Sequence, residues 1–235
     1  MVSADHRPRP GRPRRVQPNS ELSPRAQILD AAAALFSELG VAATSTRAIA
    51  DRVGIRQASL YYHFSGKDEI LIELLTTSVR PSLQFVQRLE GMVPRGATPA
   101  GALFALARID VQTLEMTPHN IGTLYLLPEV QHERYAPFRY ERYELRDSYG
   151  RLGVQAATAE VLATVPPGIL GAILIQLAEV VIQLRRQHQP VASDAIASSC
   201  LRAVGLSGSA IDAAREESDR LLVMAGEPAA DPPAQ

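Results

Sequence analysis

The sequence predicts an all-α protein, with an N-terminal domain of three short helices and a larger helical domain after it. Apolar residues recur at helical spacing along most of the chain, and no β-strand pattern of any length follows residue 71. Serine, glycine and proline stand where these helices should begin and end. With 235 residues, of which 46% are hydrophobic and 21% charged, the chain can bury a substantial core.

The N-terminal helices are marked by their boundary residues. Ser23 can cap a helix that has Pro24 at its first position and Gly40 at its end. Ser45 can cap a second helix of about two turns, which Gly54 ends. A third helix follows, and Ser65 is the expected cap of a long fourth helix. The predicted ranges are 24–39, 46–53, 57–63 and 66–89.

The second and third of these helices have the layout of a helix-turn-helix, whose second helix enters the major groove of DNA. Helices this short are marginal alone, so we expect their apolar residues to share a core with the first helix. Gln57 stands near the start of the third helix, where an amide can pair with adenine. The residues expected in the shared core are Ile49, Val53, Ile55, Leu60 and Phe64.

The remaining ranges are read from apolar spacing and from breaks such as GMVPRGATP. Helix 167–188 has one narrow polar stripe and is otherwise apolar, so it has more apolar surface than its own core needs. That surface should meet either a second layer of the same chain or another subunit. The predicted ranges are 99–116, 119–127, 132–163, 167–188, 193–204 and 209–224, and residues 226–235 form an unstructured tail.

Composition excludes several classes. A single cysteine, Cys200, permits neither an internal disulfide nor a cysteine-rich zinc site and fits a reducing cytoplasm. The start of the chain lacks the apolar run of a signal peptide. The apolar stretch 168–184 is rather short for a bilayer span and is interrupted by polar residues. We therefore expect a cytoplasmic protein with no membrane partner.

Charge is divided unevenly along the chain. The net charge is −1, but residues 1–67 sum to +5 and the remainder to −6. This asymmetry suggests that the N-terminal part meets an anion; a merely solvated basic tail is the alternative. Residues 1–22 alternate arginine with proline and should be disordered. Their pattern is typical of arms that enter the minor groove, through Arg9, Arg12, Arg14 and Arg15. A non-specific electrostatic role is the alternative.

The stretch TSTRAIADRVGIRQASLYYHFSGKDEIL resembles the DNA-binding segment of the TetR family of transcriptional repressors. The resemblance covers roughly residues 24–72 and includes the motif LYYHF followed by a lysine. It implies that Gln57 reads a base, and that the hydroxyls of Ser59 and Tyr61 hold phosphates. The other residues at the implied interface are Arg47, Tyr62, His63 and Lys67. Thr46 is added because it lies at the N-terminus of the second helix, where backbone N–H groups favour a phosphate.

Two positions depart from the family pattern. Ala48 replaces an acid that would complete a capping box, which puts the strength of the cap in doubt. Arg56 replaces a small residue and suggests an added phosphate or base contact. Two assignments also have structural alternatives: Tyr62 could pack against the first helix, and His63 could support the domain.

The resemblance further implies that residues 23–70 are the DNA-binding domain and that residues 71–225 bind a small ligand and dimerise. Two-fold symmetry then requires a pseudo-palindromic operator of double-stranded DNA. We expect a homodimer and a small apolar or aromatic ligand. The candidate ligand residues are Thr113, Asn120, Tyr125 and Tyr149, and the candidate dimer residues are Ile173, Leu177, Val180, Val181 and Leu184.

An enzyme is the main rival class, and its motifs are incomplete. GLSGS at 205–209 lacks the final glycine and the preceding strand of a nucleophile elbow. HERYAPF lacks the second histidine of a zinc helix, so we expect no metal and no cofactor. The interpretation is a homodimeric repressor that a small molecule releases from its operator. The alternatives are a transcriptional activator or a ligand-independent DNA-binding dimer with a sealed C-terminal core.

Overall fold

The computed structural model describes residues 22–226, and every regular element among them is a helix, as the sequence predicts. The described chain divides into two compact units between Ile70 and Leu71. The basic-arm arginines and the tail after residue 226 lie outside the described residues. The first unit contains α1 (Pro24–Leu39), α2 (Thr46–Val53), α3 (Gln57–His63) and the first turn of α4 (Lys67–Met92).

Local capping explains where α1 and α2 begin and end. The Ser23 hydroxyl accepts a hydrogen bond from the Ala26 N–H at 3.2 Å, and α1 stops at Gly40, whose φ is +84°. The Ser45 hydroxyl accepts from the Ala48 N–H at 3.0 Å. Gly54 ends α2 in the left-handed conformation, with φ +78°, which costs glycine little.

The start of α4 differs from its prediction. The Ser65 hydroxyl and N–H both donate to the Glu69 carboxylate, at 2.7 and 2.6 Å, so Ser65 does not cap the helix through its own oxygen. These two bonds, the backbone one first, lower the pKa of Glu69. The Glu69 carboxylate, in the first turn of α4, thus accepts both hydrogen bonds from Ser65, which precedes the helix.

The core of the first unit is small and apolar. Ile28 and Phe36 of α1 are buried together with Ile49 of α2, and so are Leu60 of α3 and Phe64 beyond it. The predicted core residues Val53 and Ile55 are only partly buried. Because α2 and α3 have only about two turns each, this shared burial stabilises them where their own length would not.

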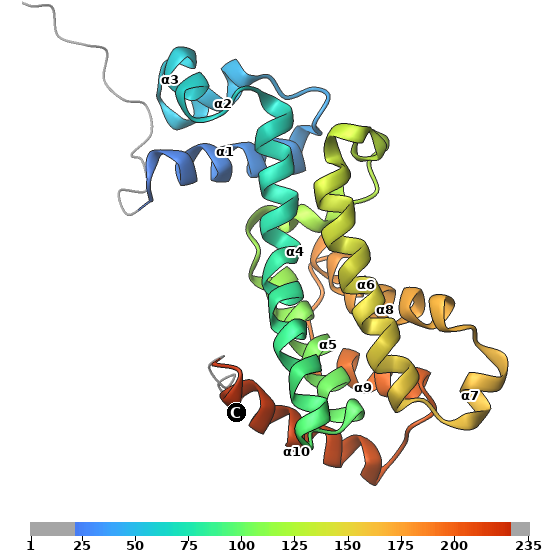
Figure 1. Cartoon of the computed structure of the whole chain (residues 1–235). Helices are drawn as coiled ribbons and strands as arrows, with labels where there is room; N and C mark the ends of the chain where they lie inside the picture. The colour runs from blue at the N-terminus through green and yellow to red at the C-terminus, as the bar shows by residue number, and fades with distance from the viewer. Residues whose placement is uncertain (1–21, 227–235) are drawn as a thin grey trace, which may run out of the picture. The chain divides into compact units, whose positions relative to one another are not determined.

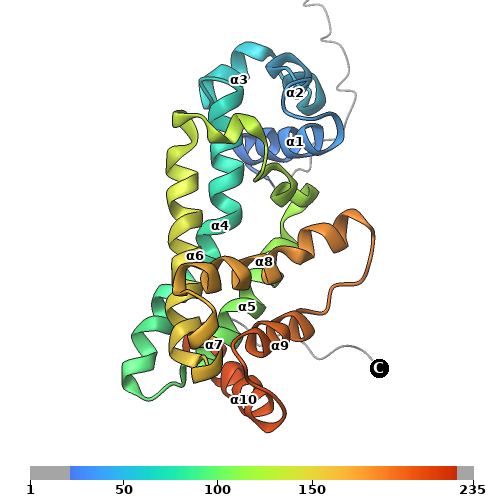
Figure 2. The same cartoon turned by 90° about the vertical axis from the view of Figure 1, so that its right-hand side faces the viewer.

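The second unit is built around α5 (Pro99–Met116), which packs against α6, α8, α9 and α10 (Figures 1 and 2). Residues 102–107 of α5 are fully buried, which is typical of a central helix. The surrounding helices are α6 (Ala136–Ala156), α7 (Ala159–Thr164), α8 (Pro167–Arg186), α9 (Ser193–Ala203) and α10 (Ser209–Met224).

Two predicted helices of this unit were wrong. Range 119–127 is the 3₁₀ segment η2 (Pro118–Leu124), in which His119 and Asn120 have φ of +58° and +49°. Range 132–163 is divided into η4 (Glu133–Tyr135), α6 and α7. The predicted helix is interrupted between α6 and α7 because the Thr158 N–H donates to the Val204 carbonyl at 3.0 Å and the Thr158 side chain caps α7. Two further short 3₁₀ segments are η1 (Val93–Arg95) and η3 (Pro128–Gln131).

Glycines allow α6 and α8 to approach closely. A Cβ atom added at Gly171 would lie 2.9 Å from the Arg146 carbonyl oxygen and 3.0 Å from the Gly150 Cα. One added at Gly168, one turn earlier in α8, would meet nothing within 4 Å. The close packing of α6 against α8 therefore requires that residue 171 have no side chain.

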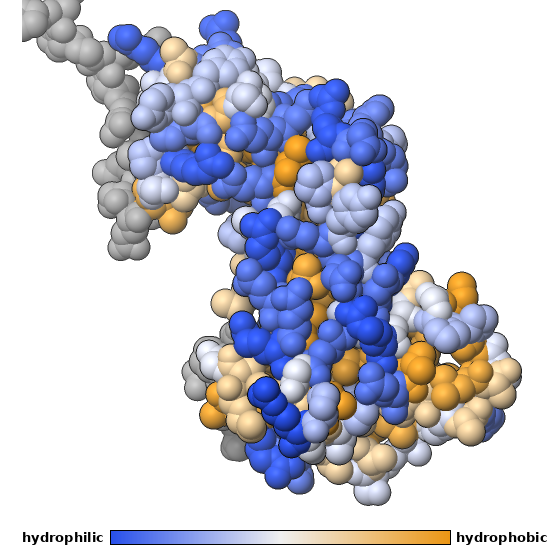
Figure 3. Space-filling model, viewed as in Figure 1, coloured by the Kyte–Doolittle hydropathy of each residue, from blue (hydrophilic) through white to orange (hydrophobic). Residues whose placement is uncertain are grey.

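One side of α8 is buried in its own unit and the other carries exposed apolar residues. Leu174, Ala178 and Val181 are fully buried, whereas Ile173 and Val180 are 40% and 39% exposed. By length and composition alone α8 could cross a membrane, and 39% of its most apolar window is buried in this unit. Apolar side chains also gather over α7 and the neighbouring part of α8 (Figure 3).

Candidate nucleic-acid interface and ligand region

The core of the first unit fixes which face of α2 and α3 is exposed. Ile49 and Leu60 point inward and are fully buried, so the opposite face of each helix lies in solvent. Tyr61 and Tyr62 of α3 are 50% and 87% exposed. The short helix α3 thus exposes polar and aromatic side chains, while its apolar residue Leu60 packs in the core of the unit. This is the form of a groove-reading helix.

Three predicted site residues form a hydrogen-bonded triangle on the exposed face. The Gln57 Nε2 donates to the Thr46 Oγ1 at 2.9 Å and to the Tyr61 hydroxyl at 3.4 Å. The Thr46 and Tyr61 hydroxyls lie 3.2 Å apart, within hydrogen-bond distance. The triangle joins Thr46, the first residue of α2, to Gln57 and Tyr61 of α3. The sequence analysis placed Thr46 and Gln57 near helix starts and took Tyr61 from the family resemblance, but it did not predict that the three bond together.

The cations of the site fall into two groups. Arg47 is 80% exposed, with only a 3.9 Å ion pair to Asp51, and Arg56 is exposed at the start of α3. Lys67 instead donates to the Val41 and Thr44 carbonyls, at 2.6 and 2.9 Å. Arg47 and Arg56 are therefore available to an anion, whereas Lys67 links the start of α4 to the loop between α1 and α2.

Tyr62 and His63 lie side by side at the end of α3. Their rings meet edge to face, with centroids 5.2 Å apart. Because Tyr62 is 87% exposed, it does not pack against α1, which was its alternative reading. His63 is partly buried, and its carbonyl accepts from Arg25 at 2.7 Å, so its backbone has a structural role.

Two arginines that shape this unit were missed by the sequence analysis. The Arg25 guanidinium lies 4.1 Å from the centroid of the Phe64 ring, a cation–π contact between α1 and the end of α3. Arg52 donates to both carboxylate oxygens of Glu38, at 3.0 and 3.2 Å. Both pairs join residues distant in sequence, and no local pattern indicates them.

The predicted ligand residues of the second unit have different surroundings. The Tyr149 hydroxyl donates to the buried Asp110 carboxylate at 3.0 Å, and the Asn120 amide donates to the Ile182 carbonyl at 3.0 Å. Thr113 is half-buried on α5. Tyr125 lines a pocket of about 220 Å³ between η2 and α8. The pocket is lined by Gly122, Thr123, Tyr125, Leu126, Gln176, Glu179, Val180, Ile182 and Gln183.

A buried polar network lies beside this pocket. Arg142 of α6 donates to both carboxylate oxygens of Glu179 on α8, at 3.0 and 2.6 Å, and the Tyr125 and Ser78 hydroxyls lie 2.7 Å apart. Burial raises the pKa of Asp110 to about 6 and also raises the pKa of Tyr125. Tyr125 and Glu179 belong both to the pocket wall and to this network.

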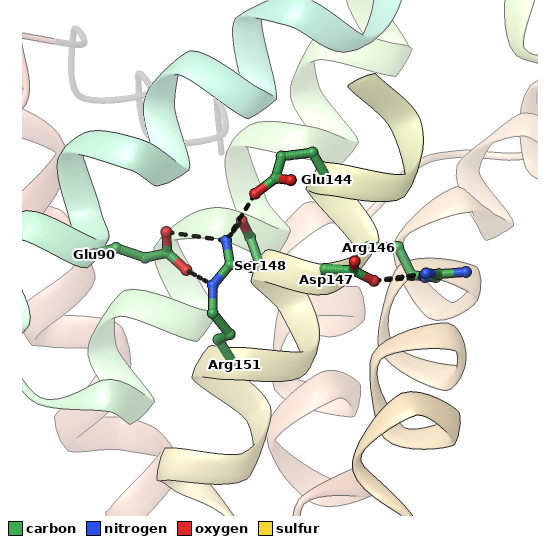
Figure 4. Close-up of polar contacts among 6 residues, drawn as sticks. All are labelled: Glu90, Glu144, Arg146, Asp147, Ser148 and Arg151. Carbon is green, nitrogen blue, oxygen red and sulfur yellow. Dashed lines mark hydrogen bonds and ion pairs between the residues drawn. The ribbon is translucent and has the colours of Figure 1, made fainter. Parts of the chain in front are cut away.

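A second polar cluster joins α4 to α6 (Figure 4). Arg151 donates to Glu90 at 2.8 Å, to Glu144 at 3.2 Å and to Ser148 at 2.6 Å, and Arg146 donates to Asp147 at 2.7 Å. Hydrogen bonding to Glu90 is the largest cause that raises the pKa of Arg151. Both arginines line a groove of about 420 Å³ between α6 and α8, but each already has a carboxylate partner.

The predicted dimer residues are not all at the surface. Ile173 and Val180 are exposed, and Leu177 and Leu184 are partly buried. Val181 was wrongly included, because it is fully buried inside its own unit. It follows Val180 by one position, which turns its side chain about 100° around the helix into the core of its own unit. Ile169, 55% exposed, extends the surface and was not predicted.

Comparison with known proteins identifies the family. The model described as "Bacterial regulatory proteins, tetR family" matches residues 28–74. The HTH-type transcriptional repressor KstR2 of Mycobacterium tuberculosis is 51% identical over 53 residues, which cover 23% of this chain and 26% of that protein. The match thus spans about a quarter of that relative's length.

Solved structures extend the similarity to the second unit. The crystal structure of Mycobacterium smegmatis AmtR shares 36% identity with a TM-score of 0.76, covering 91% of this chain and 100% of that one. The ketosteroid transcriptional regulator KstR2 of Mycobacterium tuberculosis shares the fold, with 24% identity, a TM-score of 0.57 and coverage of 80% and 94%. The chain therefore belongs to the tetR family of bacterial regulatory proteins, which are transcriptional regulators and not enzymes.

Proposed function

We propose that this protein is a sequence-specific repressor that binds a DNA operator as a homodimer and leaves it when a small molecule binds. One observation carries the proposal: α2 and α3 are fixed by a shared core and expose a joined set of polar side chains, Thr46, Gln57 and Tyr61. The relatives named KstR2, which are similar to this chain over 53 residues, are named as transcriptional repressors, which favours repression over activation.

In this proposal α3 enters the major groove and Gln57 contacts a base edge. The hydroxyls of Ser59 and Tyr61 and the exposed guanidinium of Arg47 hold the phosphates on either side. Arg56, exposed at the first turn of α3, adds a phosphate or base contact. Lys67 acts chiefly by holding the loop before α2 in place, since its ammonium already has carbonyl partners.

The basic arm at residues 9–15 adds affinity through the minor groove, and we expect it to steepen the dependence of binding on salt. Four arginines in each chain, eight in the dimer, that each neutralise one phosphate would change the slope of log K against log[salt] by about 7. This part of the proposal concerns residues outside those that the structure describes.

The dimer forms through the exposed apolar side of α8. Ile169, Ile173 and Val180 recur along one side of this helix, and Leu177 is partly buried beside them. Contact with a second copy would remove these side chains from water. A two-fold dimer then reads two half-sites about one helical turn or more apart, so the operator is pseudo-palindromic.

The ligand binds in the pocket between η2 and α8. Its wall combines apolar side chains such as Leu126 and Ile182 with the polar Gln176 and Gln183, which suits a small apolar or aromatic body with one or two polar groups. Val180 belongs to the pocket wall and to the proposed dimer surface. A ligand that moves α8 would therefore also change the dimer.

The test is selection of bound duplexes from random DNA by the full chain, followed by a screen for compounds that lower this binding. We expect an enriched inverted repeat and at least one compound that releases it. If no sequence is enriched at low salt, the DNA-binding proposal fails. If duplexes are enriched and a compound that binds the pocket leaves the affinity unchanged, only ligand release fails.

As a regulator that binds DNA, the protein should act in the cytoplasm.

A further inference from the structure

Thr46 and Tyr61 restrict what Gln57 can offer to DNA. We propose that these two hydroxyls fix the Gln57 amide so that it presents only its oxygen, Oε1, to a base. This inference rests on the proposed function, in which α3 enters the major groove. It specifies the chemical group that the residue recognises, which is an amino group on adenine or cytosine.

The count of hydrogens carries the proposal. A glutamine amide has two N–H donors and one acceptor oxygen. The Nε2 atom of Gln57 directs one donor to the Thr46 Oγ1 at 2.9 Å and the other to the Tyr61 hydroxyl at 3.4 Å. The oxygen Oε1 takes no part in this triangle. The amide therefore has its acceptor available while both donors are engaged inside the protein.

The two hydroxyls complete the arrangement. They lie 3.2 Å apart, so one donates to the other and the second keeps its own proton. Whichever hydroxyl keeps it, one O–H remains for a phosphate oxygen. The triangle thus offers one acceptor for a base and one donor for the backbone, and both are set by bonds between α2 and α3.

This geometry changes the expected base contact. An unrestrained glutamine can pair with adenine in a bidentate way, donating to N7 and accepting from the 6-amino group. The restrained amide accepts from the amino group alone. In the major groove only adenine and cytosine present such a donor, at N6 and N4. Thr46 is therefore a positioning residue for base recognition, and its own hydroxyl need not touch the base.

Base analogues test the proposal directly. In the duplex selected by the full chain, each adenine is replaced singly by purine, which lacks the 6-amino group, or by 7-deazaadenine, which lacks N7. Each cytosine is replaced by an analogue without its 4-amino group. The relevant position is the one where the analogue's effect disappears in Gln57→Ala. There we expect loss of the amino group to weaken binding about three- to tenfold, as for one hydrogen bond, and loss of N7 to change it less than twofold.

Variants of Thr46 separate positioning from simple stability. Thr46→Val keeps the shape but removes the hydroxyl, so it frees one amide donor; at an adenine, binding should then become sensitive to loss of N7. Thr46→Ser retains the hydroxyl and should behave as the wild type. A role in folding alone would not alter sensitivity to a single base atom.

Three results would overturn the inference. The first is equal sensitivity of the wild type to loss of N7 and loss of the amino group. The second is the same analogue profile in Thr46→Val and in the wild type. The third is no position whose analogue effect depends on Gln57. A protein that selects no duplex would instead overturn the proposed function and this inference with it.

Discussion

In the N-terminal unit Thr46, Gln57 and Tyr61 lie on an exposed face of α2 and α3 and bond to one another, whereas in the C-terminal unit Asp110 of α5 and Tyr149 of α6 are buried and pair across helices. The surface triangle of Thr46, Gln57 and Tyr61 stays available to a partner. The buried pairs, such as Tyr149 with Asp110, must instead offset the cost of desolvation. Changes to the surface triangle should therefore affect binding, and changes to the buried pairs should affect stability.

The largest expected effect is on DNA binding. Replacing both Gln57 and Tyr61 by alanine should reduce affinity for the selected duplex about a thousandfold, since a dimer loses four contacts at about 1 kcal/mol each. The midpoint of thermal unfolding should not change, because Tyr61 is 50% exposed and Gln57 is exposed. Affinity is measured by fluorescence anisotropy with labelled duplex.

A matched control for this pair lies in the other unit. Tyr140 of α6 is 73% exposed, so Tyr140→Ala should leave both DNA affinity and stability unchanged. Unchanged affinity in the Gln57 and Tyr61 double variant would contradict the assignment of the interface to α3.

The next effect is on the pH dependence of stability. The pKa of Asp110 rises from 3.8 to about 6 on folding, because burial disfavours its charged form. The folded chain then holds this proton more tightly than the unfolded chain. The unfolding free energy should therefore fall by about 3 kcal/mol as the pH rises from 3.8 to about 6, and should level off at higher pH.

Asp110→Asn should remove that fall and make the protein more stable than the wild type at pH 7.5. The amide oxygen can still accept from Tyr149. Urea unfolding at a series of pH values measures this contribution against the other titrating groups. An unchanged difference between wild type and variant from pH 4 to 7.5 would show that Asp110 does not titrate as described.

A smaller loss is expected where α6 and α8 meet. Gly171→Ala should lower the unfolding free energy by about 2 kcal/mol, because the new Cβ would lie 2.9 Å from the Arg146 carbonyl oxygen. Gly168→Ala is the control, since a Cβ there meets nothing within 4 Å, and alanine should slightly stabilise the helix. Equal stability of the two variants would contradict the close packing.

The smallest effect returns to the first unit. Ser45→Ala should cost about 1 kcal/mol, because it removes the hydroxyl that accepts from the Ala48 N–H at 3.0 Å. Ser45→Gly should cost only a few tenths, as glycine is tolerated at this position. Chemical unfolding of both variants measures the difference, and a Ser45→Ala protein as stable as the wild type would show that the cap contributes little.

How much could be predicted from sequence follows the same division. Ser23, Gly40 and Ser45 act on residues three or four positions away, so the ends of α1 and α2 were predictable. The break before α7 depends on Thr158 bonding to Val204, which is 46 positions further along the chain. Likewise the backbone of Asn120 is held in part by its side-chain bond to Ile182. Neither contact has a local signal.

The candidate site shows this limit more sharply. Gln57 was predicted from its place near the start of a short helix, and Tyr61 from the motif LYYHF, and both signals are local in sequence. Their bonds to Thr46, and the hydrogen bonds from Lys67 to loop carbonyls, form only when two segments distant in sequence have folded against each other. For the same reason Tyr149 could be named as polar and buried, but its partner Asp110 could not.

The central claim is that two copies of this chain present α3 to two half-sites of one duplex. The most direct measurement is the mass of the complex, and its affinity, on the selected duplex and on the same duplex with one half-site scrambled. We predict two chains on the intact duplex and an affinity loss of at least a hundredfold on scrambling. A single bound chain whose affinity is unaffected by scrambling would contradict the account.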